Sequence, residues 1–291
     1  MDLRAIVMGL TFALIWSSAF SSARIIVADA PPLLASSLRF FISGSLAVLL
    51  ARAMGQSWRL TRTQLRATVI FGICQNALYL GLFFVAMQTI EASLAAIIAS
   101  SMPLLVGLFG WLFFGERLQP LGVIGLFAGL GGVVLIMGAR LGGGVDPMGV
   151  ALCLIGVLAL SFATLSVRGA SSGGNVEMVV GLQMLVGAVC LAIVGLLLET
   201  PDFTPSYKLL AAFAYTTFVP GLVATLIWFN LVRRIGAVRA ATFHFLNPFF
   251  GVAIAAVLLG ERLRPLDLVG VAVITVAILM VQLSKQPVRR D

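Results

Sequence analysis

Pro103 … Gly115-Glu116-Arg117-Leu118-Gln119-Pro120 in the first half of the chain returns as Pro248 … Gly260-Glu261-Arg262-Leu263-Arg264-Pro265 in the second half. In each copy an apolar run separates the first proline from Gly-Glu-Arg-Leu, and a second apolar run follows the last proline. Matched positions lie 145 residues apart in a chain of 291 residues, up to Gly125 and Gly270. An offset of half the length predicts a fold of two related halves.

The composition identifies the class of protein. Hydrophobic residues make up 60% of the chain and charged residues 10%, against about 45–50% and about 25% in soluble domains. We therefore expect an integral membrane protein. The net charge of +8 then reports orientation in the bilayer, and we predict no nucleic-acid partner. Cys74, Cys153 and Cys190 lie in apolar runs and match no zinc or redox spacing, so we predict no metal and no cofactor.

Apolar runs of about 20 residues can cross the bilayer as helices. Ten such runs are present, at about 3–27, 32–54, 67–87, 92–114, 119–139, 147–168, 176–198, 209–232, 238–259 and 265–284. The first run could also be a signal peptide, but its serines, Arg24 and its counterpart in the second half favour a membrane helix. We expect repeats at 1–140 and 146–285, followed by a cytoplasmic tail at 286–291.

The two halves are predicted to have opposite orientations. Residues 16–24 align with residues 160–168 at an offset of 144, so each half holds five helices. Because five is odd, the second half enters the membrane in the opposite sense, as in the inverted repeats of secondary transporters. Thirteen Lys and Arg residues fall on the side of the N-terminus and five on the other side. Both termini are therefore expected in the cytoplasm.

This set of features resembles the EamA-type branch of the drug/metabolite transporter superfamily. The similar residues are the doubled Gly-Glu-Arg-Leu, the stretch Leu14–Phe20, and Arg39-Phe40; Ser17 and Gln183 depart from the family pattern. Within the family, the chain is most similar to the aromatic amino-acid exporters (YddG-like). The resemblance implies ten transmembrane helices in two five-helix inverted repeats, and a multi-pass transporter of the inner (plasma) membrane. We expect a monomer whose partners are the lipid bilayer and an amino acid.

Arg39 and His244 are the deepest ionisable side chains of the predicted spans. Arg39 could pair with a substrate carboxylate, or it could bind helix carbonyls or reach the interface. His244, the only histidine, could bind substrate or carry a proton, or it could be a hydrogen-bonded interior residue. No Asp or Glu lies centrally in a predicted span, which predicts facilitated transport or weak proton exchange at most.

Other polar and aromatic side chains share helix faces near mid-membrane. Gln75, Asn76, Tyr79 and Phe83 form one face of the third span, which could line a cavity or join helices. A tryptophan near mid-span, Trp16, is not explained by an interfacial belt. The complete set of predicted substrate-binding residues is Trp16, Ser18, Arg39, Gln75, Asn76, Tyr79, Phe83, Tyr215, His244 and Asn247.

Two further pairs of residues belong to the repeat. Pro103 and Pro248 near mid-span are predicted to kink their helices and act as hinges, with a static bend as the alternative. Glu116 and Glu261 fall at the membrane surface, where we expect them to stabilise the turns into the fifth and tenth helices.

The resemblance implies an exporter or facilitator of amino acids, aromatic and other neutral ones, and the inverted repeat predicts that it works by alternating access. Export of other metabolites or drugs is the alternative, although the lack of a buried carboxylate counts against cationic drugs. We predict no catalytic residues, because the chain offers no set of side chains that an enzyme would need.

Overall fold

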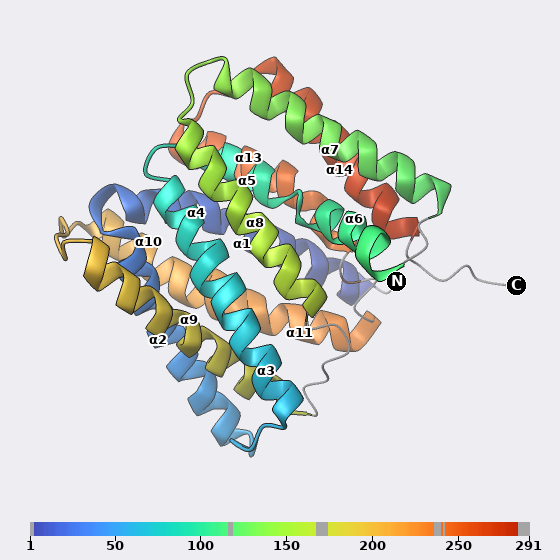
Figure 1. The fold of residues 1–291 in the computed structure, drawn as a ribbon. Helices are drawn as coiled ribbons and strands as arrows, with labels where there is room; N and C mark the ends of the chain where they lie inside the picture. Colours follow the sequence, from blue (N-terminus) through green and yellow to red (C-terminus); the bar gives the residue numbers. More distant parts are fainter. Residues whose placement is uncertain (1–2, 116–118, 167–173, 236–239, 241, 285–291) are drawn as a thin grey trace, which may run out of the picture. The chain divides into compact units, whose positions relative to one another are not determined.

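The computed structural model describes residues 3–115, 119–166, 174–235, 240 and 242–284, and every regular element in them is a helix (Figure 1). Within these described ranges, nine helices are long and apolar enough to cross a membrane, at Leu3–Asp29, Pro32–Ala53, Arg62–Ala86, Ala92–Phe113, Pro120–Leu141, Pro147–Ser166, Val176–Leu198, Tyr207–Val232 and Pro265–Ser284. A shorter apolar helix at Phe243–Leu259 lies in the remaining predicted run. The prediction of an all-helical membrane protein is confirmed.

Several spans contain more than one helical segment. The elements of the first half are α1 (Leu3–Asp29), α2 (Pro32–Ala53), α3 (Arg62–Phe71), η1 (Gly72–Tyr79), α4 (Leu80–Ala86), α5 (Ala92–Ala99), α6 (Met102–Phe114) and α7 (Pro120–Leu141). Those of the second half are α8 (Pro147–Ser166), α9 (Val176–Leu198), α10 (Tyr207–Phe218), η2 (Val219–Val223), α11 (Ala224–Ile235), η3 (Thr242–Leu246), α13 (Asn247–Leu259) and α14 (Pro265–Ser284).

The compact units of the fold do not follow the sequence halves. Unit 1 comprises Met1–Ser21, Ile90–Pro147 and Val223–Asp291, and unit 2 comprises Ser22–Thr89 and Met148–Leu222. Each unit therefore combines segments of both halves. The repeat boundaries at 140 and 146 are a different division of the chain and stay a prediction.

Helices α7 and α14 lie side by side in unit 1 (Figure 1). A Cβ at Gly125 would lie 2.7 Å from Met280 Cβ, and one at Gly270 would lie 2.3 Å from Ile136 Cδ1. Residues later in α7 contact residues earlier in α14, so the two helices are antiparallel. Gly125 and Gly270 are equivalent in the repeat, and each allows its helix to approach the other closely.

Helices α2 and α9 form the corresponding antiparallel pair in unit 2. A Cβ at Gly44 would lie 3.0 Å from Met184 Cβ, near the middle of both helices. A Cβ at Gly195, near the end of α9, would lie 2.9 Å from Leu34 Cδ2, near the start of α2. Since α2 and α9 are the second helices of their halves, their opposite directions are those expected of an inverted repeat.

The two helices of this pair cap each other. Beyond the end of α9, the carboxylate of Glu199 accepts hydrogen bonds from the backbone N–H groups of Leu33 (2.8 Å) and Leu34 (2.9 Å) at the start of α2. Beyond the end of α2, Gln56 Oε1 accepts from the N–H of Met178 (3.0 Å) at the start of α9. Both caps satisfy donors that a helix leaves free at its first turn.

We expect Glu199→Ala to lower the free energy of unfolding by about 1 kcal/mol, the usual cost of a lost N-terminal cap. Unfolding by sodium dodecyl sulfate in mixed micelles measures this change. Asp202→Ala removes an exposed carboxylate from the same connection and is the matched control. Equal stability of the two variants would contradict a capping role for Glu199.

The structure corrects the prediction that Pro103 and Pro248 kink continuous helices. Pro103 lies in the first turn of α6, and Pro248 lies in the first turn of α13. Each proline thus begins a new segment, where its missing N–H costs no hydrogen bond. Before Pro103, the hydroxyls of Ser100 and Ser101 donate to the carbonyls of Ala96 and Ile98, both at 2.7 Å. A hinge function for these breaks stays a prediction.

The structure also revises the prediction for the glutamates. Glu116 lies outside the described residues. Glu261 does not stabilise the turn into the last helix, because its carboxylate accepts from the N–H groups of Ala92 (2.7 Å) and Ser93 (2.9 Å) at the start of α5. The turn into α14 is stabilised instead by Asp267, whose Oδ2 accepts from the N–H of Arg264 at 2.8 Å.

Two π-helical segments were not predicted. η1 spans Gly72–Tyr79 and η2 spans Val219–Val223. Pro220 accounts for the second, because a proline cannot donate the regular backbone hydrogen bond. The first contains Gln75, Asn76 and Tyr79, and π-helical turns are frequent at functional sites. η1 therefore marks the polar face of the third span as a region of interest.

Candidate functional site

The predicted site residues divide between the two units, and each unit is described by itself. Trp16, Ser18, His244 and Asn247 belong to unit 1, whereas Arg39, Gln75, Asn76, Tyr79, Phe83 and Tyr215 belong to unit 2.

In unit 1, Phe12, Trp16, Trp228 and His244 form an aromatic–histidine cluster. Phe12 is 2% exposed, and its ring centroid lies 5.6 Å from that of Trp16, 4.8 Å from that of Trp228 and 5.4 Å from that of His244. Trp228 and His244 meet edge to face at 5.1 Å. Trp16 and His244 are thus brought together, through a phenylalanine that was not among the predicted site residues. Phe12 could have been predicted from its position one helical turn before Trp16, which places both rings on the same face of α1.

His244 is held by the residue that begins α13. The Asn247 amide nitrogen lies 2.9 Å from His244 Nδ1. This side-chain hydrogen bond holds the imidazole ring in one orientation. The backbone carbonyl oxygen of Asn247 accepts a hydrogen bond from the Ser17 hydroxyl at 3.3 Å. A histidine ring held in this way presents its other nitrogen, Nε2, in a fixed direction.

Ser18, also on α1, is 8% exposed. Its hydroxyl donates to the carbonyl of Ile15 at 2.7 Å, within the same helix. This contact describes packing; substrate binding by Ser18 stays a prediction.

In unit 2, the polar face of the third span joins neighbouring helices. Asn76 is 1% exposed and its amide donates to the carbonyl of Gln183 on α9 at 2.9 Å. Tyr79 and Phe83 are buried with ring centroids 4.6 Å apart. A Cβ at Gly156 on α8 would lie 3.0 Å from the Phe83 ring. These contacts match the helix-joining alternative, and cavity lining stays a prediction.

The two remaining residues of unit 2 are more accessible. Gln75 is half-buried within η1, and Tyr215 on α10 is 36% exposed.

Arg39 has the most demanding environment in unit 2. It is 5% exposed, and its guanidinium carbon lies 4.2 Å from the ring centroid of Phe40 and 4.8 Å from that of Phe84. Among the described residues, its Nε has no hydrogen-bond partner and no carboxylate forms an ion pair with it. The two rings offset part of the cost of burying the charge. An anion at this side chain would offset more.

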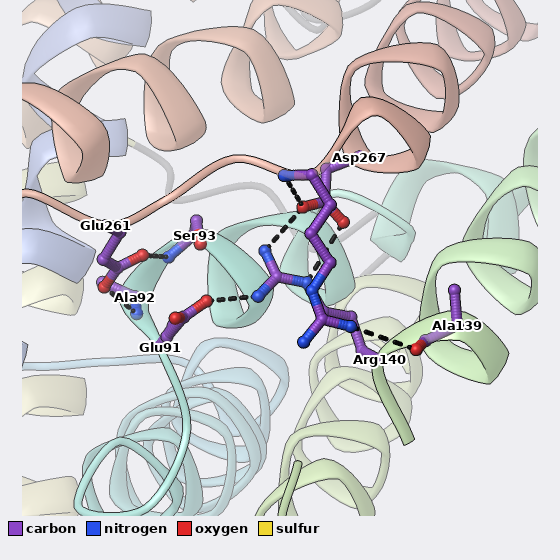
Figure 2. Close-up of polar contacts among 8 residues, drawn as sticks. Glu91, Ala92, Ser93, Ala139, Arg140, Glu261 and Asp267 are labelled. Carbon is purple, nitrogen blue, oxygen red and sulfur yellow. Dashed lines mark hydrogen bonds and ion pairs between the residues drawn. The ribbon is translucent and has the colours of Figure 1, made fainter. Parts of the chain in front are cut away.

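A charged network that was not predicted lies in unit 1 (Figure 2). Arg140 at the end of α7 binds Asp267 in the first turn of α14 with two hydrogen bonds, Nε–Oδ1 at 3.1 Å and Nη2–Oδ2 at 2.7 Å. Its Nη1 also forms an ion pair with Glu91, just before α5. The Arg140 and Asp267 side chains are only 3% and 2% exposed. The sequence feature that could have predicted this network is the topology, because it places all three residues at the same predicted outer surface.

The described residues contain no group of three or more His, Cys, Asp or Glu side chains that could hold a metal ion.

Comparison with known proteins agrees with this architecture. The chain is 30% identical to the uncharacterized inner membrane transporter YedA of Escherichia coli strain K12, over 95% of this chain and 90% of that protein. It is 28% identical to the uncharacterized transporter YvbV of Bacillus subtilis, over 92% and 88%. A solved crystal structure, 24% identical, has the same fold with a TM-score of 0.70 and covers 97% of this chain and 98% of that one.

Both halves also match one family separately. Residues 3–138 and residues 147–283 each match the EamA-like transporter family. The match explains why equivalent helices recur in both halves. The protein is thus a multi-pass membrane transporter rather than an enzyme, and the chain belongs to the EamA-like transporter family.

Proposed function

We propose that this transporter moves amino acids, aromatic and other neutral ones, by alternating access, as the aromatic amino-acid exporters do. The observation that carries the proposal is the aromatic–histidine cluster of unit 1. Aromatic rings recognise a flat apolar side chain through offset or edge-to-face contacts. The His244 ring adds a polar group of fixed orientation beside Trp228 and Phe12.

Arg39 supports an amino acid as the substrate class. Its buried guanidinium lies over two phenylalanine rings and makes no ion pair among the described residues. A guanidinium binds a carboxylate through two parallel hydrogen bonds. We propose that Arg39 binds the carboxylate during transport and that the helix breaks before Pro103 and Pro248 serve as hinges. We also propose substrate contacts for Ser18 and Asn247 in unit 1, and for Gln75, Asn76, Tyr79, Phe83 and Tyr215 in unit 2.

We further propose that transport is facilitated rather than strictly proton-coupled. Asp267 is the buried carboxylate in the described part of the chain, and it is engaged by Arg140. Both oxygens of this carboxylate are occupied by hydrogen bonds from Arg140, so it is part of the packing of α7 against α14 rather than a free group along a transport path. A fixed ratio of protons to substrate in proteoliposomes would contradict this part of the proposal.

Counterflow into proteoliposomes with a panel of labelled amino acids tests the substrate class. We expect uptake of aromatic and other neutral amino acids, and a loss of aromatic uptake by about twofold to tenfold in Trp16→Ala, the range that a lost aromatic contact of about 0.5–1.5 kcal/mol implies. His244→Ala is expected to lower aromatic uptake in the same range. Small neutral amino acids should be less affected by Trp16→Ala, because they do not reach the ring.

Trp111→Ala is the matched control. Trp111 lies on α6, is 39% exposed and is not part of the aromatic–histidine cluster. Its removal should leave aromatic uptake unchanged. If the wild-type protein moved none of the amino acids but did move other metabolites or drugs, the amino-acid proposal would be overturned.

A further inference from the structure

A cavity of about 580 Å³ lies in unit 1, between the start of α1 and the helix α11. Its lining includes Arg4, Met8, Leu226, Ile227, Asn230 and Arg234, all of them in unit 1. This volume is typical of a binding site for a small organic molecule. None of these residues belongs to the proposed substrate site.

The lining is apolar along its wall and basic at one end. Val223, Leu226 and Ile227 are spaced by three and four residues, and therefore share one face around α11. Arg4 lies in the first turn of α1 and Arg234 lies near the end of α11, and both are exposed. On the predicted topology these are the cytoplasmic ends of both helices. The lining residues include no Asp or Glu, so the charged side chains of the cavity wall are all positive.

One face of α1 connects the cavity with the aromatic–histidine cluster. From Arg4, steps of four residues lead to Met8, Phe12 and Trp16, which therefore form a continuous stripe along the helix. Met8 packs with Trp228 against the buried residues around Leu231. Trp228 in turn contacts Phe12. The cavity lining and the aromatic–histidine cluster thus lie on one stripe of α1, with Met8 as the cavity residue one helical turn before Phe12.

We propose that this cavity is a cytoplasmic vestibule that binds organic carboxylates with an apolar body, before they reach the aromatic–histidine cluster. The inference rests on the proposed function for the transport step that comes after binding, but the binding itself is independent of transport. Two guanidinium groups form charge-assisted hydrogen bonds with a carboxylate. The wall of Met8, Leu226 and Ile227 accommodates the apolar body. Arg4 and Arg234 therefore favour solutes that carry a carboxylate.

Arginines at a cytoplasmic surface also set the orientation of a membrane protein, and a matched control separates this role from ligand binding. Arg52 and Arg59 are exposed, lie on the same predicted side, and do not line the cavity. Arg52→Gln and Arg59→Gln remove the same charge as Arg4→Gln and Arg234→Gln. Only the latter pair should change the binding of a ligand.

The test uses two probes of similar size, N-acetylphenylalanine with a carboxylate and N-acetylphenylalaninamide with a neutral carboxamide in its place, in calorimetric titrations of the purified full-length protein. We expect the carboxylate probe to bind about tenfold more tightly than the amide, since hydrogen bonds to charged groups are stronger than neutral ones. Arg4→Gln and Arg234→Gln should each remove this preference, and Arg52→Gln should retain it. Arg4→Lys should restore part of the binding.

The remaining outcomes distinguish the vestibule from the proposed function, and a carboxylate solute from a lipid headgroup as the bound anion. If both probes bind equally, or if Arg52→Gln acts as Arg4→Gln does, the vestibule is overturned. If phosphatidylglycerol added to the micelles displaces the carboxylate probe at equal concentration, the cavity is a site for a lipid headgroup, and the vestibule is overturned too. Amino-acid counterflow with unchanged binding in Arg4→Gln overturns the vestibule alone. Carboxylate binding without any amino-acid counterflow overturns the proposed function alone.

Discussion

Arg140→Leu is expected to lower the free energy of unfolding by about 3–5 kcal/mol, the cost of breaking a buried ion pair by removing one partner. Without the guanidinium, the carboxylate of Asp267 stays buried beside α7 and has no other ion-pair partner among the described residues. Glu91 would lose its partner too, but its side chain is 41% exposed and water can solvate it. Unfolding by sodium dodecyl sulfate in mixed micelles measures the loss.

If the loss of stability comes from the unpaired charge of Asp267, then removing that charge should restore stability. Arg140→Leu combined with Asp267→Asn leaves no buried charge and keeps an acceptor for the N–H of Arg264. We expect the double variant to regain most of the stability, because a buried ion pair replaced by neutral groups is often tolerated. Arg264→Leu is the control; this exposed side chain donates to the Ala139 carbonyl at 3.2 Å and should contribute less than about 1 kcal/mol. A double variant as unstable as Arg140→Leu would refute this explanation.

Two glycines of the same helix are expected to respond oppositely to one added methyl group. In Gly125→Ala, the new Cβ would lie 2.7 Å from Met280 Cβ and 2.8 Å from the carbonyl oxygen of Ala277. Because one of these atoms belongs to the backbone of α14, the helices must separate. Overpacking of this kind costs about 1–3 kcal/mol.

Gly131→Ala provides the control within α7. A Cβ at Gly131 would have no neighbouring atom within 4 Å, so the only change is the gain in helix propensity, about 1 kcal/mol at most. The same unfolding assay should rank Gly131→Ala at or above the wild type and Gly125→Ala below it. Equal stability of both variants would show that close approach of α7 and α14 does not stabilise the fold.

The sequence predicted the fold because the constraints of a bilayer are strong and few. Runs of about 20 apolar residues have almost no choice other than a helix, and the doubled Gly-Glu-Arg-Leu identified the two halves. The breaks within spans were less predictable. Pro103 and Pro248 signalled an irregularity, but hydropathy alone does not distinguish a kinked helix from two helical segments. The η1 segment carries no proline, and hence no such signal.

The candidate site was predictable only in part. Trp16 and His244 stood out because each is rare at its depth, and the structure brings them together through Phe12. The pairing of Arg140 with Asp267 was missed, because these residues lie 127 positions apart and have no common motif. Which helices lie side by side depends on packing of small residues such as Gly125 and Gly270, and a single sequence does not reveal these pairs.

The pairing of α2 with α9, and of α7 with α14, has a consequence for biosynthesis. At about 5–20 residues per second, the ribosome needs on the order of ten seconds after completing α2 before α9 emerges. During that interval the face of α2 that contains Gly44 must be covered by lipid or by the insertion machinery. The same holds for α7 until α14 is made. Unit 2 can therefore close first, and unit 1 waits for the last helix of the chain.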